Sequence, residues 1–167
     1  MKHFALAALA VLSLASCAKQ YVAPSAGPTA TLTLSASIAG AGPVLLVQNF
    51  DNEQCAPSAN GTRLATFTTT SVQGAGDPHD GVARVVPAGR PVVFSYIYQF
   101  GLPPFTNSNS CQVTQSFVPV PGASYRARFD IVGQVCRVQV LREDGSAPGA
   151  VEALRQVQPA CYNTLNG

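Results

Sequence analysis

The sequence Tyr-Arg-Ala-Arg-Phe-Asp-Ile-Val, at residues 125–132, decides the fold class of this chain. Its apolar side chains stand at alternate positions, Tyr125, Ala127, Phe129 and Ile131, with Arg or Asp between them. Successive side chains of a β-strand point to opposite faces, so this alternation predicts a strand that is buried on one face and solvated on the other. Such a strand needs a sheet around it and a second layer over its apolar face.

Further short strands are expected on both sides of this segment. Pro at 13 positions and Gly at 14 keep long helices out and punctuate runs of β-prone residues. The expected strands cover residues 31–38, 44–50, 64–72, 82–86, 91–100, 111–118, 136–141 and 149–157. This spacing predicts an all-β fold, an antiparallel β-sandwich of immunoglobulin-like or transthyretin-like type, with a closed barrel as the alternative. The core Trp of immunoglobulin domains is missing, because the chain has no Trp.

The cysteines indicate an oxidising compartment. Apart from Cys17 they form an even set of four, namely Cys55, Cys111, Cys136 and Cys161. Outside the cytosol such a set predicts two disulfides, whereas the absence of any Cys-x-x-Cys pair argues against a zinc site. Three pairings are open. We favour Cys136 with Cys161 and Cys55 with Cys111, because the first pair flanks an expected hairpin around residues 143–145.

The N-terminus has the parts of an export signal. Lys2 gives it a positive charge, residues 4–14 form an apolar h-region, and Leu14-Ala15-Ser16-Cys17 ends it. An apolar run of this length is too short to cross about 30 Å of hydrocarbon, so a transmembrane helix is not expected. The stretch resembles the signal of bacterial lipoproteins, with its lipobox. An ordinary secretory signal that releases a soluble protein is the alternative.

The resemblance implies a membrane anchor. In lipoproteins the cysteine of the box, Cys17 here, is acylated and the chain is cut before it, so residues 1–16 would be the signal peptide. The partner of the anchor is a membrane, which several acyl chains hold stably. Because Ala18 replaces the Asp that retains such proteins at the inner membrane, the resemblance implies the outer membrane, facing the periplasm.

The rest of the chain divides into two parts. Residues 17–30 contain the lipidated cysteine and a segment rich in Pro, Ala and Gly, which predicts a flexible tether. Residues 31–167 are expected to form the β-sandwich domain. Without Lys2 there are nine basic and eight acidic side chains, and the Arg residues are scattered, so the sequence gives no sign of nucleic-acid binding.

Two loops carry residues suited to chemistry. His79 stands in Asp77-Pro78-His79-Asp80-Gly81 and could ligate a metal or act as a general base, although Asp-Pro and Asp-Gly also form ordinary solvated turns. Asp51-Asn52-Glu53 offers oxygen atoms for Ca²⁺, but its spacing does not follow the EF-hand loop. We therefore expect neither a metal nor another cofactor.

An aromatic stripe supplies the candidate contact surface. Phe94 and Tyr96 are expected in the core, whereas Tyr98, Phe100 and Phe105 lie near a loop and are candidates for contact with a partner, since aromatic side chains anchor protein interfaces.

These observations predict a non-enzymatic, membrane-anchored lipoprotein that binds a protein partner or structural component of the cell envelope. The architecture resembles small lipoproteins, among them those of type VI secretion, which combine an anchor with a transthyretin-like sandwich. Gly122-Ala123-Ser124-Tyr125 resembles part of the motif of lysozyme-inhibitor lipoproteins, whose downstream Trp is missing here. The alternatives are such an inhibitor, or a hydrolase or metal-binding protein centred on His79.

Overall fold

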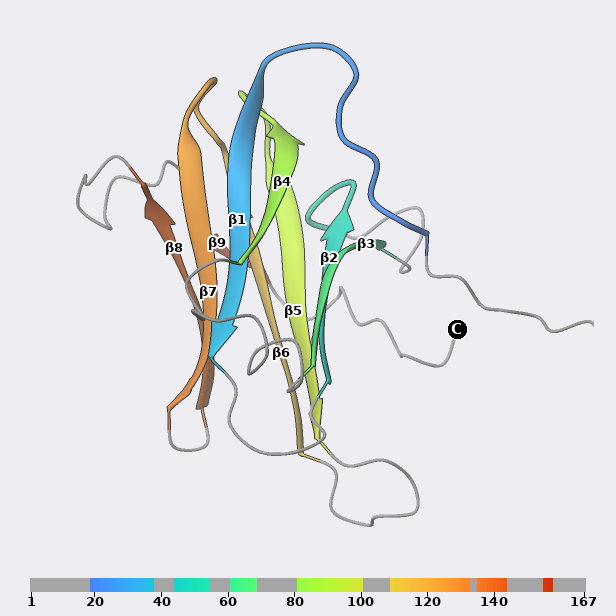
Figure 1. Cartoon of the computed structure of the whole chain (residues 1–167), viewed down its shortest axis with the longest axis vertical. Helices are drawn as coiled ribbons and strands as arrows, with labels where there is room; N and C mark the ends of the chain where they lie inside the picture. Colours follow the sequence, from blue (N-terminus) through green and yellow to red (C-terminus); the bar gives the residue numbers. More distant parts are fainter. Residues whose placement is uncertain are drawn as a thin grey trace, which may run out of the picture.

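The described part of the chain is built of β-strands and their connections. The structure is a computed structural model, and it describes residues 19–37, 44–54, 61–68, 81–100, 109–132, 135–143 and 155–157. Its strands are β1 (Thr29–Ser37), β2 (Val44–Phe50), β3 (Thr62–Thr68), β4 (Val82–Pro87), β5 (Val92–Phe100), β6 (Asn109–Phe117), β7 (Ser124–Val132), β8 (Val135–Arg142) and β9 (Arg155–Gln156). Figure 1 shows the long strands running along the vertical axis of the molecule.

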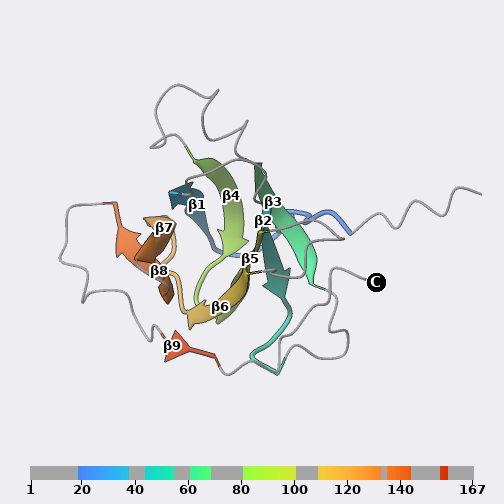
Figure 2. The same ribbon diagram turned by 90° about the horizontal axis from the view of Figure 1, so that it is seen from below.

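The strands form two sheets packed face to face. One sheet has the order β4-β1-β7-β8 and the other the order β3-β2-β5-β6-β9. Figure 2, a view along the strands, shows the two layers on either side of a shared interior. The β-sandwich expected from the sequence is therefore confirmed. The ladders between the described strands are antiparallel except that β1 and β7 run parallel, from Thr31 opposite Ser124 to Ser37 opposite Asp130.

The strand order distinguishes between the two expected sandwich types. In immunoglobulin domains the first two strands are neighbours in one sheet. Here β1 and β2 lie in different sheets, and β1 is inserted between β4 and β7. The order is therefore not that of an immunoglobulin domain, and of the two expected types the transthyretin-like one remains.

The core lies between the sheets and is rich in aromatic rings. Tyr125, Ala127 and Phe129 are fully buried, as their alternation predicts, whereas Ile131 near the end of β7 is 36% exposed. Phe129 stacks on Tyr96 of the opposite sheet, with ring centroids 5.6 Å apart. Each aromatic pair of this kind contributes about 0.5–1.5 kcal/mol beyond the burial of its area.

The five-stranded sheet is buried on its outer face as well. The continuous apolar sequence of β2 predicts this, and its Leu45, Leu46 and Val47 are all buried. On neighbouring strands the outward side chains are polar but also buried and paired: Ser95 Oγ and Thr114 Oγ1 are 2.9 Å apart. A small apolar cluster of Phe50, Val93 and Val157 covers one end of this face.

A disulfide joins the two sheets. It links Cys111 of β6 to Cys136 of β8, with Cα atoms 6.4 Å apart. The favoured pairing of Cys136 with Cys161 and of Cys55 with Cys111 is therefore wrong. The two strands begin at the same end of the sandwich in facing sheets, which brings their first cysteines together. One disulfide is therefore seen where two were expected, and Cys55 and Cys161 lie outside the described residues.

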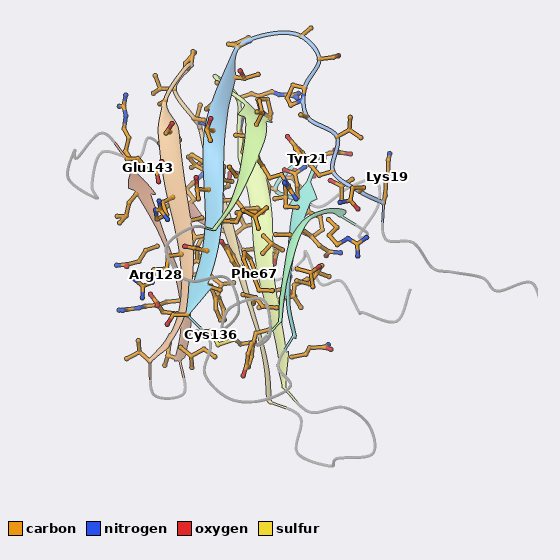
Figure 3. The ribbon with its side chains drawn as sticks, in the orientation of Figure 1. Lys19, Tyr21, Phe67, Arg128, Cys136 and Glu143 are labelled. Atoms are coloured by element: carbon orange, nitrogen blue, oxygen red, sulfur yellow. A yellow bond between two sulfur atoms is a disulfide. The ribbon has the colours of Figure 1, made fainter. Side chains whose placement is uncertain are left out.

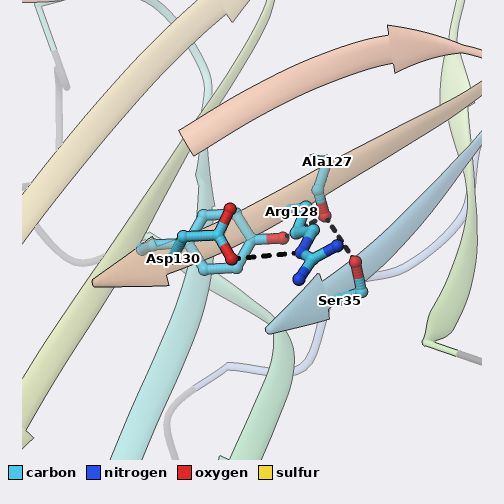
Figure 4. A network of polar contacts seen from close by, with 5 residues as sticks. Ser35, Ala127, Arg128 and Asp130 are labelled. Carbon is cyan, nitrogen blue, oxygen red and sulfur yellow. Dashed lines mark hydrogen bonds and ion pairs between the residues drawn. The ribbon is translucent and has the colours of Figure 1, made fainter. Parts of the chain in front are cut away.

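A buried hydrogen bond also crosses between the sheets. Tyr96 Oη of β5 donates to the carbonyl of Ala127 in β7 at 2.8 Å, and Ser35 Oγ of β1 donates to the same carbonyl at 3.3 Å (Figure 4). Burial raises the pKa of Tyr96 far above its usual range, so the hydroxyl stays protonated and keeps its proton for this bond.

Candidate functional site: a groove at one end and an exposed hairpin at the other

The N-terminal segment, residues 19–28, lies on the domain. Arg63 of β3 donates its backbone N–H to the carbonyl of Lys19 at 2.8 Å, and Tyr21 donates its N–H to the carbonyl of Arg63 at 3.0 Å. The Arg63 side chain adds a bond from Nη2 to Gln20 Oε1 at 3.3 Å. Figure 3 shows Tyr21 turned toward the strands and Lys19 at the outer side of the segment.

The same segment continues across the edge of the other sheet. Tyr21 Oη donates to the carbonyl of Val85 in β4 at 3.0 Å, and Ala88 donates its N–H to the carbonyl of Pro28 at 2.9 Å. Burial raises the pKa of the Tyr21 hydroxyl, an effect that the nearby Arg90 partly offsets. Segment 19–28 thus bridges edge strands β3 and β4, which would otherwise present unpaired backbone groups.

This arrangement differs from the flexible tether expected over residues 17–30. Thr29 and Ala30 belong to β1, and residues 19–21 are bonded to β3. Composition suggested a tether because the segment has few side chains to bury. Its contacts are made mainly by backbone atoms and by one aromatic ring, and neither leaves a periodic signal in the sequence.

A groove of about 740 Å³ opens beside this segment. Its walls come from the N-terminal segment, from the end of β2 with the residues after it, and from the turn between β4 and β5. Apolar and charged side chains share its lining. Its lining residues include Lys19, Tyr21, Val22, Phe50, Asp51, Glu53, Arg90, Val92 and Arg155.

The carboxylate of Glu53 is engaged inside the protein. It accepts a hydrogen bond from Ser116 Oγ at 2.8 Å and forms an ion pair with Arg155. Asn52 Oδ1 accepts a hydrogen bond from the N–H of Gln54 at 3.0 Å, which closes a local turn. Residues 51–53 therefore tie the end of β2 to β6 and β9.

At the opposite end of the sandwich the β7–β8 hairpin carries an apolar patch. Ile131 is 36% exposed, Val132 54% and Val135 66%, and we call these three side chains the hairpin patch. The Cys111–Cys136 disulfide lies beside it, since Cys136 pairs with Ile131 across the hairpin. Figure 3 shows Cys136 at this lower end, away from Lys19.

The sequence carried a signal for the hairpin patch that the prediction did not use. Ile131, Val132 and Val135 flank a short Gly-Gln connection, so apolar side chains continue to the very tip of the hairpin. Strict alternation would place a polar residue at Val132. Two consecutive apolar residues at a strand end show that at least one of them faces away from the core.

Of the three aromatic side chains predicted to contact a partner, the structure describes only that of Tyr98. Tyr98 is 9% exposed and belongs to the core, where its ring stacks on Phe129 with centroids 6.0 Å apart. It is therefore a packing residue in this structure. The side chain of Phe100 and all of Phe105 lie outside the described residues. His79 and its two aspartates, and the lipidation candidate Cys17, also lie outside them.

The residues that resemble a lysozyme-inhibitor motif span the end of the turn before β7 and the first two residues of β7. Tyr125 is fully buried, its ring packs edge-on against Phe117, and its hydroxyl accepts a hydrogen bond from the N–H of Val120 at 2.9 Å. Its packing on Phe117 and its bond to Val120 give this side chain a structural role in closing the turn.

Among residues whose placement is described, no three His, Cys, Asp or Glu side chains gather as a metal site. The same residues form no helix that is long and apolar enough to span a membrane. No protein-family model, curated protein or solved structure matches this chain.

Proposed function

We propose that this protein is a lipoprotein of the bacterial cell envelope that works by binding, without catalysis. Its Cys17 is acylated and holds it in a membrane, with the outer membrane as the expected one. The β-sandwich is the binding domain, and the hairpin patch is the surface that contacts an envelope protein with an apolar surface of its own.

The exposure of the hairpin patch is the observation that carries this proposal. Among the described residues only five large hydrophobic side chains are exposed, and three of them lie at the tip of one hairpin, where Val132 is directly opposite Val135 and Ile131 is the residue before Val132. Scattered apolar side chains on a surface are ordinary, but gathered ones mark contact sites. Around the patch the chain is charged, with Arg137 directly across from Asp130, and this gives the polar rim that interfaces commonly have.

The hairpin patch is also held rigidly. The disulfide ties β8 to the facing sheet next to the patch, and β7 and β8 pair along their whole length, from Tyr125 opposite Arg142 to Val132 opposite Val135. A preorganised surface loses little conformational entropy when a partner binds, so a small apolar area contributes more to affinity.

Crosslinking in intact cells tests the proposed contact. A photo-reactive amino acid at Val135 is expected to give a specific adduct with another envelope protein. Gln139 is the matched control, because it lies on the same strand, is exposed, and stands outside the hairpin patch. Adducts of equal yield and identity from both positions, or from neither, would contradict the proposed surface.

A second variant separates binding from folding. Val135→Asp places a charge in the hairpin patch at a site that is 66% exposed, so it is expected to change stability by no more than about 0.5 kcal/mol. The adduct formed from a probe at Val132 should nevertheless be lost. A full yield of that adduct in the Val135→Asp protein would remove the hairpin patch from the interface.

Acylation is tested separately. Labelled palmitate should enter the wild-type protein and be absent from Cys17→Ala, whose membrane fraction should fall accordingly. Equal labelling and equal membrane association of the two proteins would refute the anchor.

A further inference from the structure

We infer that the groove end of the domain rests directly on the lipid headgroups of the membrane that holds Cys17, with Lys19, Val22 and Arg90 facing the lipid. This inference rests on the acylation of Cys17 proposed above. It adds an orientation: the domain does not hang from a tether, because the tether is folded onto it.

The first step is the length of chain between lipid and domain. Ala18 is the only residue between Cys17 and Lys19. Two residue steps span at most about 7 Å, even when the chain is fully extended. The headgroup region on each side of a bilayer is about 5–8 Å thick. A cysteine whose acyl chains enter the hydrocarbon therefore brings Lys19 into the headgroup layer or next to it.

The second step is that Lys19 is part of the folded domain. Its carbonyl accepts the hydrogen bond from Arg63, and Tyr21 follows with one backbone bond and one hydroxyl bond to the two edge strands. The Tyr21 ring also packs against the core. The domain thus comes to the membrane together with Lys19.

The third step is the chemistry of the surface around Lys19. Val22 is 78% exposed, the highest value among the large hydrophobic side chains of the described residues. It lines the groove together with the exposed cations Lys19 and Arg90. An aliphatic side chain flanked by cations suits an interface where lipid phosphates lie beside acyl chains. Asp51 lies on another wall of the groove, at the end of β2, while Glu53 is paired with Arg155.

The fourth step is that the hairpin patch lies at the end of the domain away from the membrane. β1 starts at the groove end, where Thr29 is opposite Pro87, and finishes at the hairpin end, where Ser37 is opposite Asp130. Its length of nine residues corresponds to about 26 Å between these ends. The hairpin patch is therefore held on the far side of the domain, open to a partner.

A single tryptophan reports this orientation cleanly, because the wild-type chain has none. The acylated, full-length Val22→Trp protein is placed on vesicles of phosphatidylethanolamine and phosphatidylglycerol that contain brominated acyl chains. We expect a blue shift and loss of most of its emission through quenching. Val135→Trp, in the hairpin patch, is the matched control and is expected to show neither effect.

Flotation of the same samples distinguishes an error in the orientation from an error in the anchor. Protein that floats with the vesicles while Val22→Trp stays unquenched would overturn the orientation and leave the anchor intact. Protein that does not float would overturn the anchor, and the orientation with it. A flexible Gly-Ser linker inserted between Ala18 and Lys19 should keep flotation and abolish quenching. Undiminished quenching in that variant would show that proximity to Cys17 is not what places Val22 in the lipid.

Discussion

At the residue scale, Tyr96 is the side chain on which both sheets converge. Its ring stacks on Phe129 and its hydroxyl bonds to the carbonyl of Ala127, both in the opposite sheet. A buried hydroxyl that keeps its partner contributes about 0.5–1.5 kcal/mol, and the same group without a partner would destabilise the fold. Tyr96 therefore stabilises the contact between the sheets both by packing its ring and by hydrogen-bonding its buried hydroxyl.

Removing this hydroxyl should weaken the sandwich measurably. Tyr96→Phe is expected to lower the free energy of unfolding by about 1 kcal/mol, because it removes the buried hydrogen bond to the Ala127 carbonyl. Denaturant titration gives the value. Tyr21→Phe, which removes a hydroxyl bond that is less deeply buried, is the comparison and should cost less. A smaller loss for Tyr96→Phe than for Tyr21→Phe would contradict the role assigned here.

The same hydroxyl should make the fold sensitive to alkali. Burial raises the pKa of Tyr96 above its ordinary value of 10.0, so the folded state holds this proton where the unfolded state releases it. The stabilisation is complete below about pH 10 and declines as the pH rises above it. Unfolding free energies measured between pH 8 and pH 11 should fall less steeply for Tyr96→Phe than for wild type. Parallel curves would exclude Tyr96 as the source.

Gly81 and Gly89 allow the cost of a positive φ to be measured separately from the cost of a steric clash. Gly81 and Gly89 both have positive φ, +47° and +74°, but a Cβ on Gly81 would lie 2.6 Å from the Leu34 carbonyl oxygen, whereas one on Gly89 would meet nothing within 4 Å. Both Ala variants should lose about 1 kcal/mol through the left-handed conformation. Gly81→Ala should lose about 1–3 kcal/mol more, because backbone must shift. Equal melting temperatures of the two variants would contradict this contact.

At the scale of elements, most strands could be predicted and their partners could not. The alternation of Tyr125, Ala127 and Phe129 and the turn residues between strands are local features, so the strand positions follow from them. The parallel pairing of β1 with β7 depends on packing between segments more than eighty residues apart, and no local pattern encodes it. The groove is assembled from the ends of several elements, and segment 19–28 makes backbone contacts, so neither could be predicted from composition.

The Cys111–Cys136 disulfide should supply a large part of the stability. It closes a loop of 25 residues and ties the two sheets together. The Cys111→Ala, Cys136→Ala double variant is expected to lose about 3 kcal/mol, as loop-closure entropy predicts. Denaturant titration of the oxidised wild type and of this variant measures the difference. A difference below 1 kcal/mol would show that the facing sheets hold themselves in place.

The remaining cysteines then have one pairing left. With Cys111 joined to Cys136, the even set predicts a bond between Cys55 and Cys161. Peptide mapping of exported protein without reduction should recover these two residues in one linked fragment. Thiol labelling of both in oxidised protein would refute the second disulfide.

At the scale of the whole molecule, the sandwich has two ends with different surfaces. The groove end gathers the N-terminal segment and several charged side chains, and the hairpin end gathers exposed aliphatic side chains beside the disulfide. The strands that separate these ends are continuously paired, so the ends keep a fixed distance and orientation. A protein held at one end and bound at the other needs such a rigid spacer.

The central position of β1 in its sheet also affects when the strand can fold during synthesis of the chain. A ribosome delivers the N-terminal part of a chain first, yet β1 pairs on one side with β4 and on the other with β7, whose first matched residue is Ser124. Until that part of the chain has been made and delivered, Leu32 and Leu34 have no complete sheet to cover them. Folds dominated by such distant pairings form slowly. The chain must therefore be kept from aggregating while most of it is being synthesised. The first strand to be made, β1, is among the last to be paired on both sides.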